Sequence, residues 1–150
     1  MAPTRLVLLL FARRKAGYGG SFYNVSFVGT QAQSDELGQE GAGVVVSQVM
    51  PSPYNAARPI AREFVDAVKA AGKDAQVNFS SMEGYLAARV LVEGIKRAGA
   101  KATRDSLITG LESIGTQSIG GFNVSFSPTD HVGSSFVELS MLMGGGRIRT

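Results

Sequence analysis

Two short polar segments carry the side chains best suited to hold a small ligand. The first, Gly29, Thr30 and Gln31, directly follows an apolar extended segment and begins a predicted helix. In open α/β sheets ligands collect beyond the carboxyl ends of strands, where helix N-termini offer unpaired N–H groups to a carboxylate. Thr30 and Gln33 also have the spacing of a capping box, and spacing alone favours Thr30 as a helix cap over a ligand contact.

The second segment contains Ser81, Glu83 and Tyr85, near the start of another predicted helix. The Glu83 carboxylate suits a ligand ammonium group, and the Tyr85 ring suits the apolar part of the same ligand. Ser80 and Glu83 again have capping-box spacing, which by itself favours a structural role for this segment.

Side chains that suit catalysis are scarce. His131 is the only histidine, and its position in a Pro-Thr-Asp-His turn favours a structural role over that of a general base. The chain has no cysteine, so a zinc site would depend on carboxylates, a poor match to zinc. Gly41–Gly43 precedes a valine-rich strand instead of joining a strand to a helix, so it is no dinucleotide fingerprint. We therefore expect a protein that is not an enzyme and that uses neither a metal nor a cofactor.

Composition and charge exclude several classes of protein. The 150 residues, 44% hydrophobic and 18% charged, suit one ordinary domain or two incomplete ones and exclude a disordered chain. The net charge of +3 is concentrated in the first fifteen residues, which contain Arg5, Arg13, Arg14 and Lys15 and no acid. The other residues carry 11 basic and 12 acidic groups, a balance that does not favour nucleic-acid binding.

The first residues resemble a secretory signal only superficially. The apolar segment Leu6–Phe11 is too short for a membrane span, and basic residues follow it where a signal peptide would have its cleavage site. We expect no signal peptide here, but a helix with a cationic last turn that ends at Gly17.

Hydrophobic patterning predicts an α/β protein with a proline-rich interruption. Strands are expected over residues 22–28 and 43–49, with a helix over residues 30–39 between them. Met50–Pro53 removes backbone donors and breaks regular pairing, because it contains two prolines. This segment is the best candidate for a linker.

A helical block follows the linker. The spacing predicts helices over residues 59–71, 80–97 and 103–114, the last of them capped by Thr103. The second of these helices has one apolar stripe, formed by Tyr85, Ala88, Val92 and Ile95, with Leu91 beside it.

The last third returns to extended chain. Residues 122–126 and 135–142 are expected to form a half-exposed pair of strands, because the first of them alternates cleanly between apolar and polar residues. Gly144–Gly146 then predicts either a hairpin tip or a loose terminus.

Six segments of the chain, taken in their order, carry a family resemblance. They are Phe22–Gly29, Gly41–Val49 with Pro51–Pro53, Ser81–Ile95, Phe126–Pro128, His131–Ser134 and Phe136–Leu139. Each is weak alone, but in this order they resemble the type I periplasmic binding proteins of branched-chain amino-acid ABC transporters. The resemblance covers roughly residues 11–146.

The resemblance implies parts of two doubly wound, three-layer α/β lobes, both incomplete. Residues 1–50 with residues 133–150 would belong to the second lobe, and residues 54–132, mainly helical, to the first. Residues 51–53 would form the crossover between them. The hinge residues would be Met50, Pro51, Ser52 and Pro53.

The resemblance also implies where a ligand would bind. It places Gly29, Thr30 and Gln31 on the second lobe's rim of a cleft. In the first lobe, the residues that contact the ligand would be Ser81, Glu83 and Tyr85. Family members can carry an acid where this chain has Thr30 and Gln31, so small carboxylates and aromatic acids are alternatives to an amino acid.

The implied function is substrate binding for an ABC transporter of branched-chain amino acids or related small carboxylates, in the periplasm, with a membrane permease as partner in the full-length context. Family members have several hundred residues, so we expect a truncated chain or fragment that self-associates through exposed apolar faces. The alternatives are a small α/β enzyme, in which Glu83 would be the acid, and a dimerising interaction module on the same scaffold.

Overall fold

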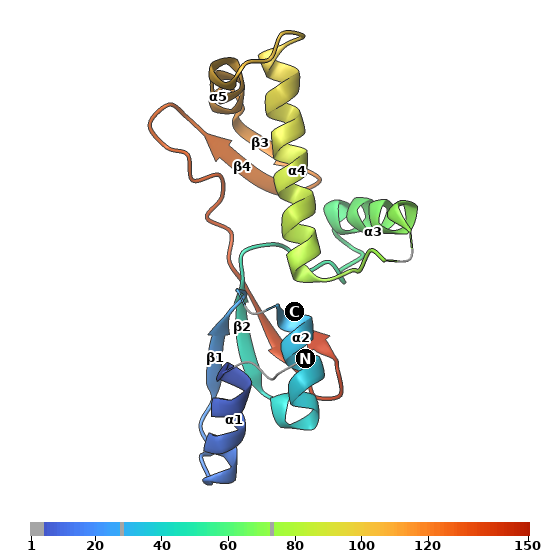
Figure 1. Ribbon diagram of the computed structural model, residues 1–150, viewed down its shortest axis with the longest axis vertical. Coiled ribbons are helices and arrows are strands. Elements are labelled where there is room, and N and C mark those ends of the chain that lie inside the picture. The colour runs from blue at the N-terminus through green and yellow to red at the C-terminus, as the bar shows by residue number, and fades with distance from the viewer. Residues whose placement is uncertain (1–4, 28, 73) are drawn as a thin grey trace. The chain divides into compact units, whose positions relative to one another are not determined.

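The computed structural model describes residues 5–27, 29–72 and 74–150, which form two compact units (Figure 1). The sheet unit contains the residues up to Met50, Asn78–Ser80 and Val137–Thr150. The helical unit contains Pro51–Val77 and Ser81–Phe136. Their identity as the second and first lobes of a receptor, with changeovers at residues 50 and 133, stays a prediction.

A mixed four-stranded sheet forms the centre of the sheet unit. In spatial order its strands are β1 (Phe22–Val25), β2 (Val44–Gln48), β5 (Glu138–Leu142) and β6 (Ile148–Arg149). β1 is parallel to β2, while β5 is antiparallel to both β2 and β6. A parallel pair needs a crossover, which α2 (Thr30–Leu37) and the 3₁₀ helix Gly38–Gly41 supply.

Helices of the sheet unit cover one face of the sheet. α1 (Arg5–Lys15) contacts α2, and both contribute to one hydrophobic core. The buried residues of this core are Leu10, Leu37, Val44, Val46 and Leu142. The strand register gathers Tyr23, Val25, Leu139 and Met141 on the other face, where they are 41–75% exposed. We call these four residues the open sheet face. The predicted α/β class is confirmed.

α1 ends as its sequence predicts. Its last turn contains the three basic residues Arg13, Arg14 and Lys15, whose charges interact favourably with the negative end of the helix dipole. Gly17 has a φ of 80°. The N–H groups of Gly17 and Tyr18 donate to the carbonyls of Arg14 and Arg13 at 2.9 and 3.0 Å. These two bonds form a Schellman motif, in which glycine accommodates the positive φ.

β1 is shorter than the strand predicted over residues 22–28. It ends at Val25, and Ser26 and Phe27 form a turn in which Phe27 is 92% exposed. Val28 lies outside the described residues. The aromatic and β-branched pattern therefore continues past the point where the backbone stops pairing.

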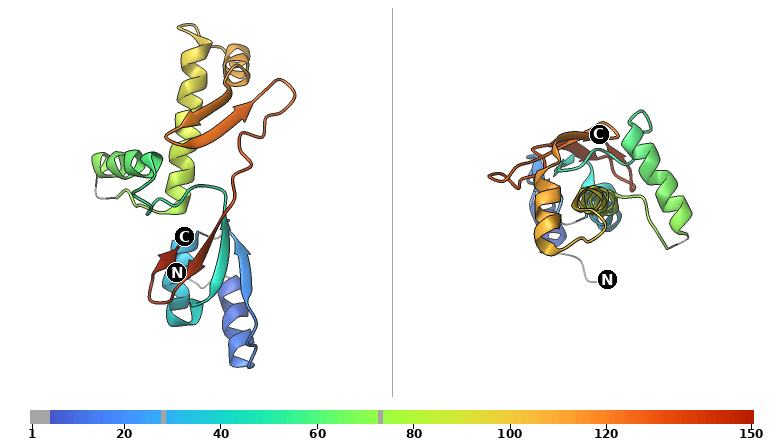
Figure 2. Two further views of the ribbon diagram at one scale, coloured as in Figure 1. Left: turned by 180° about the vertical axis from the view of Figure 1, so that it is seen from behind. Right: turned by 90° about the horizontal axis from the view of Figure 1, so that it is seen from above.

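The helical unit combines helices with a β-hairpin (Figure 2). Its elements are α3 (Pro59–Ala71), most of α4 (Phe79–Ala98), α5 (Arg104–Glu112), β3 (Gly115–Ile119) and β4 (Phe122–Phe126). β3 and β4 pair antiparallel across Gly120 and Gly121, which both have a positive φ, as this tight turn requires. The buried apolar side chains of the helical unit include Ile60, Phe64, Met82, Leu86, Ile114, Phe122 and Val124.

α4 buries other residues than those of the apolar stripe identified in its sequence. Leu91, Val92 and Ile95 are 44–47% exposed, whereas Met82 and Leu86 are at most 1% exposed. Both sets have helical spacing, so periodicity cannot say which of them finds a partner. Leu91, Val92 and Ile95 thus belong to the apolar faces that are expected to be exposed in an incomplete fold.

Strand pairing also differs from the prediction. β4 pairs with β3, while the expected partner over residues 135–142 contains β5, which joins the sheet of the other unit. β3 has the sequence Gly-Thr-Gln-Ser-Ile, which lacks an apolar alternation. Gly144–Gly146 leads from β5 to the antiparallel β6, so it is a hairpin tip rather than a loose terminus.

One of the three predicted helix caps is present. The Thr103 side chain accepts a bond from the Ser106 N–H at 3.2 Å and begins α5. α2 begins after Gly29, without a side-chain cap, and α4 begins at Phe79, so Ser80 lies inside that helix. The predicted caps at Thr30 and Ser80 are therefore wrong. None of the described helices is both long and apolar enough to cross a membrane.

Candidate ligand-binding segments

The N-terminal turn of α2 presents the first candidate segment. Gly29 is its N-cap residue, and the Gly29 carbonyl accepts the first helical bond from Gln33 N–H at 3.1 Å. The first backbone N–H groups of a helix have no partner within the helix, and together with the helix dipole they attract a carboxylate. The first turn of α2 contains no acidic residue that would repel one.

Thr30 lies in the interior of the sheet unit. It is 1% exposed, and its Oγ1 accepts a hydrogen bond from Gln48 Nε2 at 2.7 Å. Its hydroxyl is therefore neither a helix cap nor an exposed group. Gln31 is half-buried, and its Nε2 donates to Asp35 Oδ1 at 2.9 Å, one turn further along α2.

The second candidate segment lies on α4 in the helical unit. Ser81 Oγ donates to the Gln76 carbonyl at 2.6 Å, and Glu83 is exposed. Tyr85 packs against Phe64 of α3 with ring centroids 5.5 Å apart. Of these side chains, only Glu83 is exposed, whereas Ser81 and Tyr85 contribute to the local structure.

A small charged cluster holds the Tyr85 hydroxyl. Arg89 Nη1 donates to Tyr85 Oη at 2.9 Å and to Glu63 Oε2 at 2.7 Å. The hydrogen bond to Glu63 raises the pKa of Arg89, and the bond to Tyr85 adds to this. Arg89 therefore stays charged and links α4 to α3 at this point.

The predicted hinge spans the place where the chain changes unit. Met50 belongs to the sheet unit, and Pro51, Ser52 and Pro53 belong to the helical unit. Ser52 is fully buried, and its Oγ accepts a bond from Tyr54 N–H at 3.4 Å. The structure thus groups Gly29–Gln31 with Met50 in one unit and the α4 segment with the prolines in the other. Hinge motion at these residues stays a prediction.

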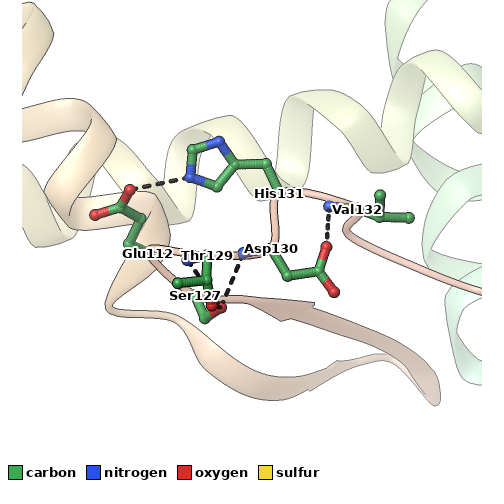
Figure 3. Close-up of polar contacts among 6 residues, drawn as sticks. All are labelled: Glu112, Ser127, Thr129, Asp130, His131 and Val132. Carbon is green, nitrogen blue, oxygen red and sulfur yellow. Dashed lines mark hydrogen bonds and ion pairs between the residues drawn. The ribbon is translucent and has the colours of Figure 1, made fainter.

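Figure 3 shows the polar contacts of His131 and of the turn in which it lies. The exposed His131 ring places Nε2 3.0 Å from Glu112 Oε1. The Asp130 carboxylate does not face the ring, because its Oδ1 accepts a bond from Val132 N–H at 2.9 Å. Ser127 Oγ accepts from the backbone of residues 129 and 130, which closes the turn. The turn role that the sequence predicts for His131 agrees with these contacts.

A surface cavity of about 460 Å³ lies beside β4. Hydroxyl groups line part of its wall, among them those of Thr116, Ser125, Ser134 and Ser135. None of the predicted ligand-binding residues contributes to it. Across the described residues, His, Asp and Glu side chains form no cluster of three or more that would hold a metal ion.

Sequence reasoning missed two residues of the sheet unit. Gln48 Nε2 contacts both Thr30 and Ser140, each at 2.7 Å. The glutamine at the end of a valine-rich strand could have indicated this role, because a buried side-chain amide needs hydrogen-bond partners. Ser140, in β5, had no comparable signal.

Comparison with solved structures defines the class of fold. A possible leucine/isoleucine/valine-binding protein from Rhodopirellula baltica matches with a TM-score of 0.89 and 30% identity, over 96% of this chain and 39% of that chain. An extracellular ligand-binding receptor from Verminephrobacter eiseniae matches with a TM-score of 0.83 and 30% identity, over 97% of this chain and 41% of that chain. A substrate-binding periplasmic protein from Ralstonia solanacearum matches with a TM-score of 0.83 and 31% identity, over 95% of this chain and 41% of that chain. The fold is thus part of a type I periplasmic binding protein.

The family follows from the sequence itself. The family model for periplasmic binding proteins matches residues 1–140, and this chain belongs to that family. No curated protein matches the chain. The predicted family resemblance is confirmed, and the chain spans about two fifths of the length of the solved structures it matches.

Proposed function

We propose that this chain is part of a solute-binding receptor that holds a branched-chain amino acid or a related small carboxylate. The observation that carries the proposal is the match to the periplasmic binding protein family over residues 1–140. The similarity to the possible leucine/isoleucine/valine-binding protein, at 30% identity, supports the ligand class. The receptor would work in the periplasm and deliver its ligand to the membrane permease of an ABC transporter.

The chemistry of the first candidate segment supports a carboxylate as the anchoring group. The N-terminal turn of α2 offers backbone N–H groups, and Gly29 adds no side chain that would screen them. Because this turn has no acidic residue, an ammonium group on the ligand would need a different partner. Glu83, exposed on α4, has the appropriate charge for that role.

Binding without catalysis is part of the proposal. Its competitor is a small α/β enzyme in which Glu83 acts as the acid, and replacing Glu83 by Gln would then abolish turnover. A receptor has no turnover to lose, so Glu83→Gln is expected to change only ligand affinity.

We also propose that the 150-residue chain associates with a second copy of itself. The open sheet face is apolar and exposed, and β1 lies at the edge of its sheet. Exposed apolar surface and unpaired strand edges both favour association.

Thermal unfolding with and without leucine tests the proposed ligand class. A ligand that binds only the folded chain stabilises it by about 2.7 kcal/mol at 100 times its dissociation constant. We expect leucine, isoleucine or valine to raise the melting temperature. Leucinamide, which keeps the amine and side chain but lacks the carboxylate, serves as the matched control and is expected to raise it less. Equal shifts for leucine and leucinamide, or no shift with any small carboxylate, would contradict the proposal.

A further inference from the structure

Gln48 is a buried glutamine at the end of an otherwise largely apolar strand. It is the last residue of β2 and is 1% exposed. Its Nε2 donates to Thr30 Oγ1 and to Ser140 Oγ, both at 2.7 Å. Ser140 Oγ in turn donates to the Val46 carbonyl at 3.3 Å. One carboxamide therefore joins α2 to both β2 and β5.

Burial makes these bonds important. Thr30 and Ser140 are also 1% exposed, so water has little access to replace a lost bond. The Oε1 atom of Gln48 is buried and has no hydrogen-bond partner among the described residues, which is unfavourable. A similarly sized apolar residue would avoid that cost. The two bonds from Nε2 are what a glutamine provides at this position.

The residues joined by Gln48 lie in the candidate ligand segment and near the points where the chain changes unit. Thr30 is the first residue of α2, between Gly29 and Gln31. Gln48 shortly precedes the change of unit after Met50, and Ser140 shortly follows the return at Val137. The hydrogen bonds thus connect the candidate ligand segment with the two strands that lead to the changes of unit.

We propose that Gln48 is a positioning residue, which fixes the N-terminal turn of α2, and with it Gly29–Gln31, to strands β2 and β5. Thr30 then serves as the internal acceptor, and ligand contacts in this segment come from Gly29 and Gln31. The relevance to ligand binding rests on the proposed function, whereas the positioning itself does not.

Amide hydrogen exchange of the full 150-residue chain, without ligand, tests this role. Thr30→Val keeps the shape of the side chain and removes Oγ1, whereas Thr30→Ser keeps the oxygen. Loss of a buried hydrogen bond is expected to lower the protection of α2 amides about tenfold in Thr30→Val. Thr30→Ser is expected to retain most of that protection.

Two further variants separate positioning from a general loss of stability. Gln48→Met is expected to lower α2 protection at least as much as Thr30→Val. Ser47→Ala is the matched control, because Ser47 precedes Gln48 in β2 and its Oγ donates a long bond, of 3.4 Å, to the Asn24 carbonyl in β1. It is expected to leave α2 protection unchanged, and none of these variants should alter the β3–β4 hairpin.

The double variant Gln48→Met with Thr30→Val gives the decisive comparison. If the two side chains act through one bond, the double variant loses little more protection than Gln48→Met alone. The proposal would be overturned if the fold-losses of α2 protection in the two single variants multiplied in the double variant. Equal losses of protection in Thr30→Val and Thr30→Ser would also overturn it. If Gln48→Met does not fold, the comparison of α2 protection between Thr30→Val and Thr30→Ser still tests the proposal. No ligand is used, so a failed ligand titration is a separate result.

Discussion

Replacing Gly110 by alanine is expected to destabilise the helical unit by about 3 kcal/mol, a large effect for one added methyl group. Gly110 is a buried residue of α5. A Cβ at this position would lie 2.5 Å from the Gly94 carbonyl oxygen and 3.1 Å from the Ala98 nitrogen, both in the backbone of α4. Backbone atoms of two packed helices cannot move aside as a flexible side chain can, so α4 and α5 would have to separate.

Gly84→Ala is the matched control for this prediction. Gly84 likewise lies within a helix, in this case α4, but a Cβ there would meet no atom within 4 Å. Alanine has the higher helix propensity, so this variant is expected to be more stable by about 0.5–1 kcal/mol. Urea unfolding followed by circular dichroism measures both changes. If Gly110→Ala proved as stable as Gly84→Ala, the close packing of α4 on α5 would be wrong.

The second large effect concerns association of the chain with itself. We expect the wild-type chain to form dimers or larger species at micromolar concentration, because the open sheet face exposes contiguous apolar side chains. The variant Val25→Lys with Leu139→Lys places two charges on this face. Its dissociation constant is expected to rise at least about tenfold, since charges at an interface must be desolvated.

Sedimentation velocity gives the measurement. Asn123→Lys with Ser125→Lys is the matched control, because both residues are exposed in β4 of the helical unit and together they gain the same two charges there. The control is expected to associate like the wild type. A monomeric wild type, or equal association of the charged variant and the control, would contradict a contact through the open sheet face.

Features that depend on neighbouring residues could be predicted from the sequence. The end of α1 at Gly17, the start of α3 at Pro59 and the cap of α5 at Thr103 are all present. Each depends on residues within one or two turns of the same helix, so local rules are sufficient. The family resemblance likewise required only the order of short segments.

Features that depend on distant residues could not be predicted in the same way. Thr30 has the spacing of a helix cap, but its hydroxyl contacts Gln48, 18 residues away, and Gln48 contacts Ser140, 92 residues away. Periodicity could not show that α4 buries Met82 and Leu86 while its apolar stripe stays exposed, because an amphipathic pattern does not identify the partner of a helix face. β3 has no apolar alternation, and only its pairing with β4 identifies it as a strand.

Titrating the ¹⁵N-labelled chain with leucine tests most directly whether Gly29–Gln31 contacts a small carboxylate. The proposed function predicts chemical-shift changes that saturate with concentration and include the amides of Gly29, Thr30 and Gln31. The amides of the β3–β4 hairpin are expected to stay unchanged, and leucinamide is expected to give weaker changes at α2. Absence of shifts at α2 with every branched-chain amino acid, or shifts confined to the hairpin, would contradict a ligand site at this helix N-terminus.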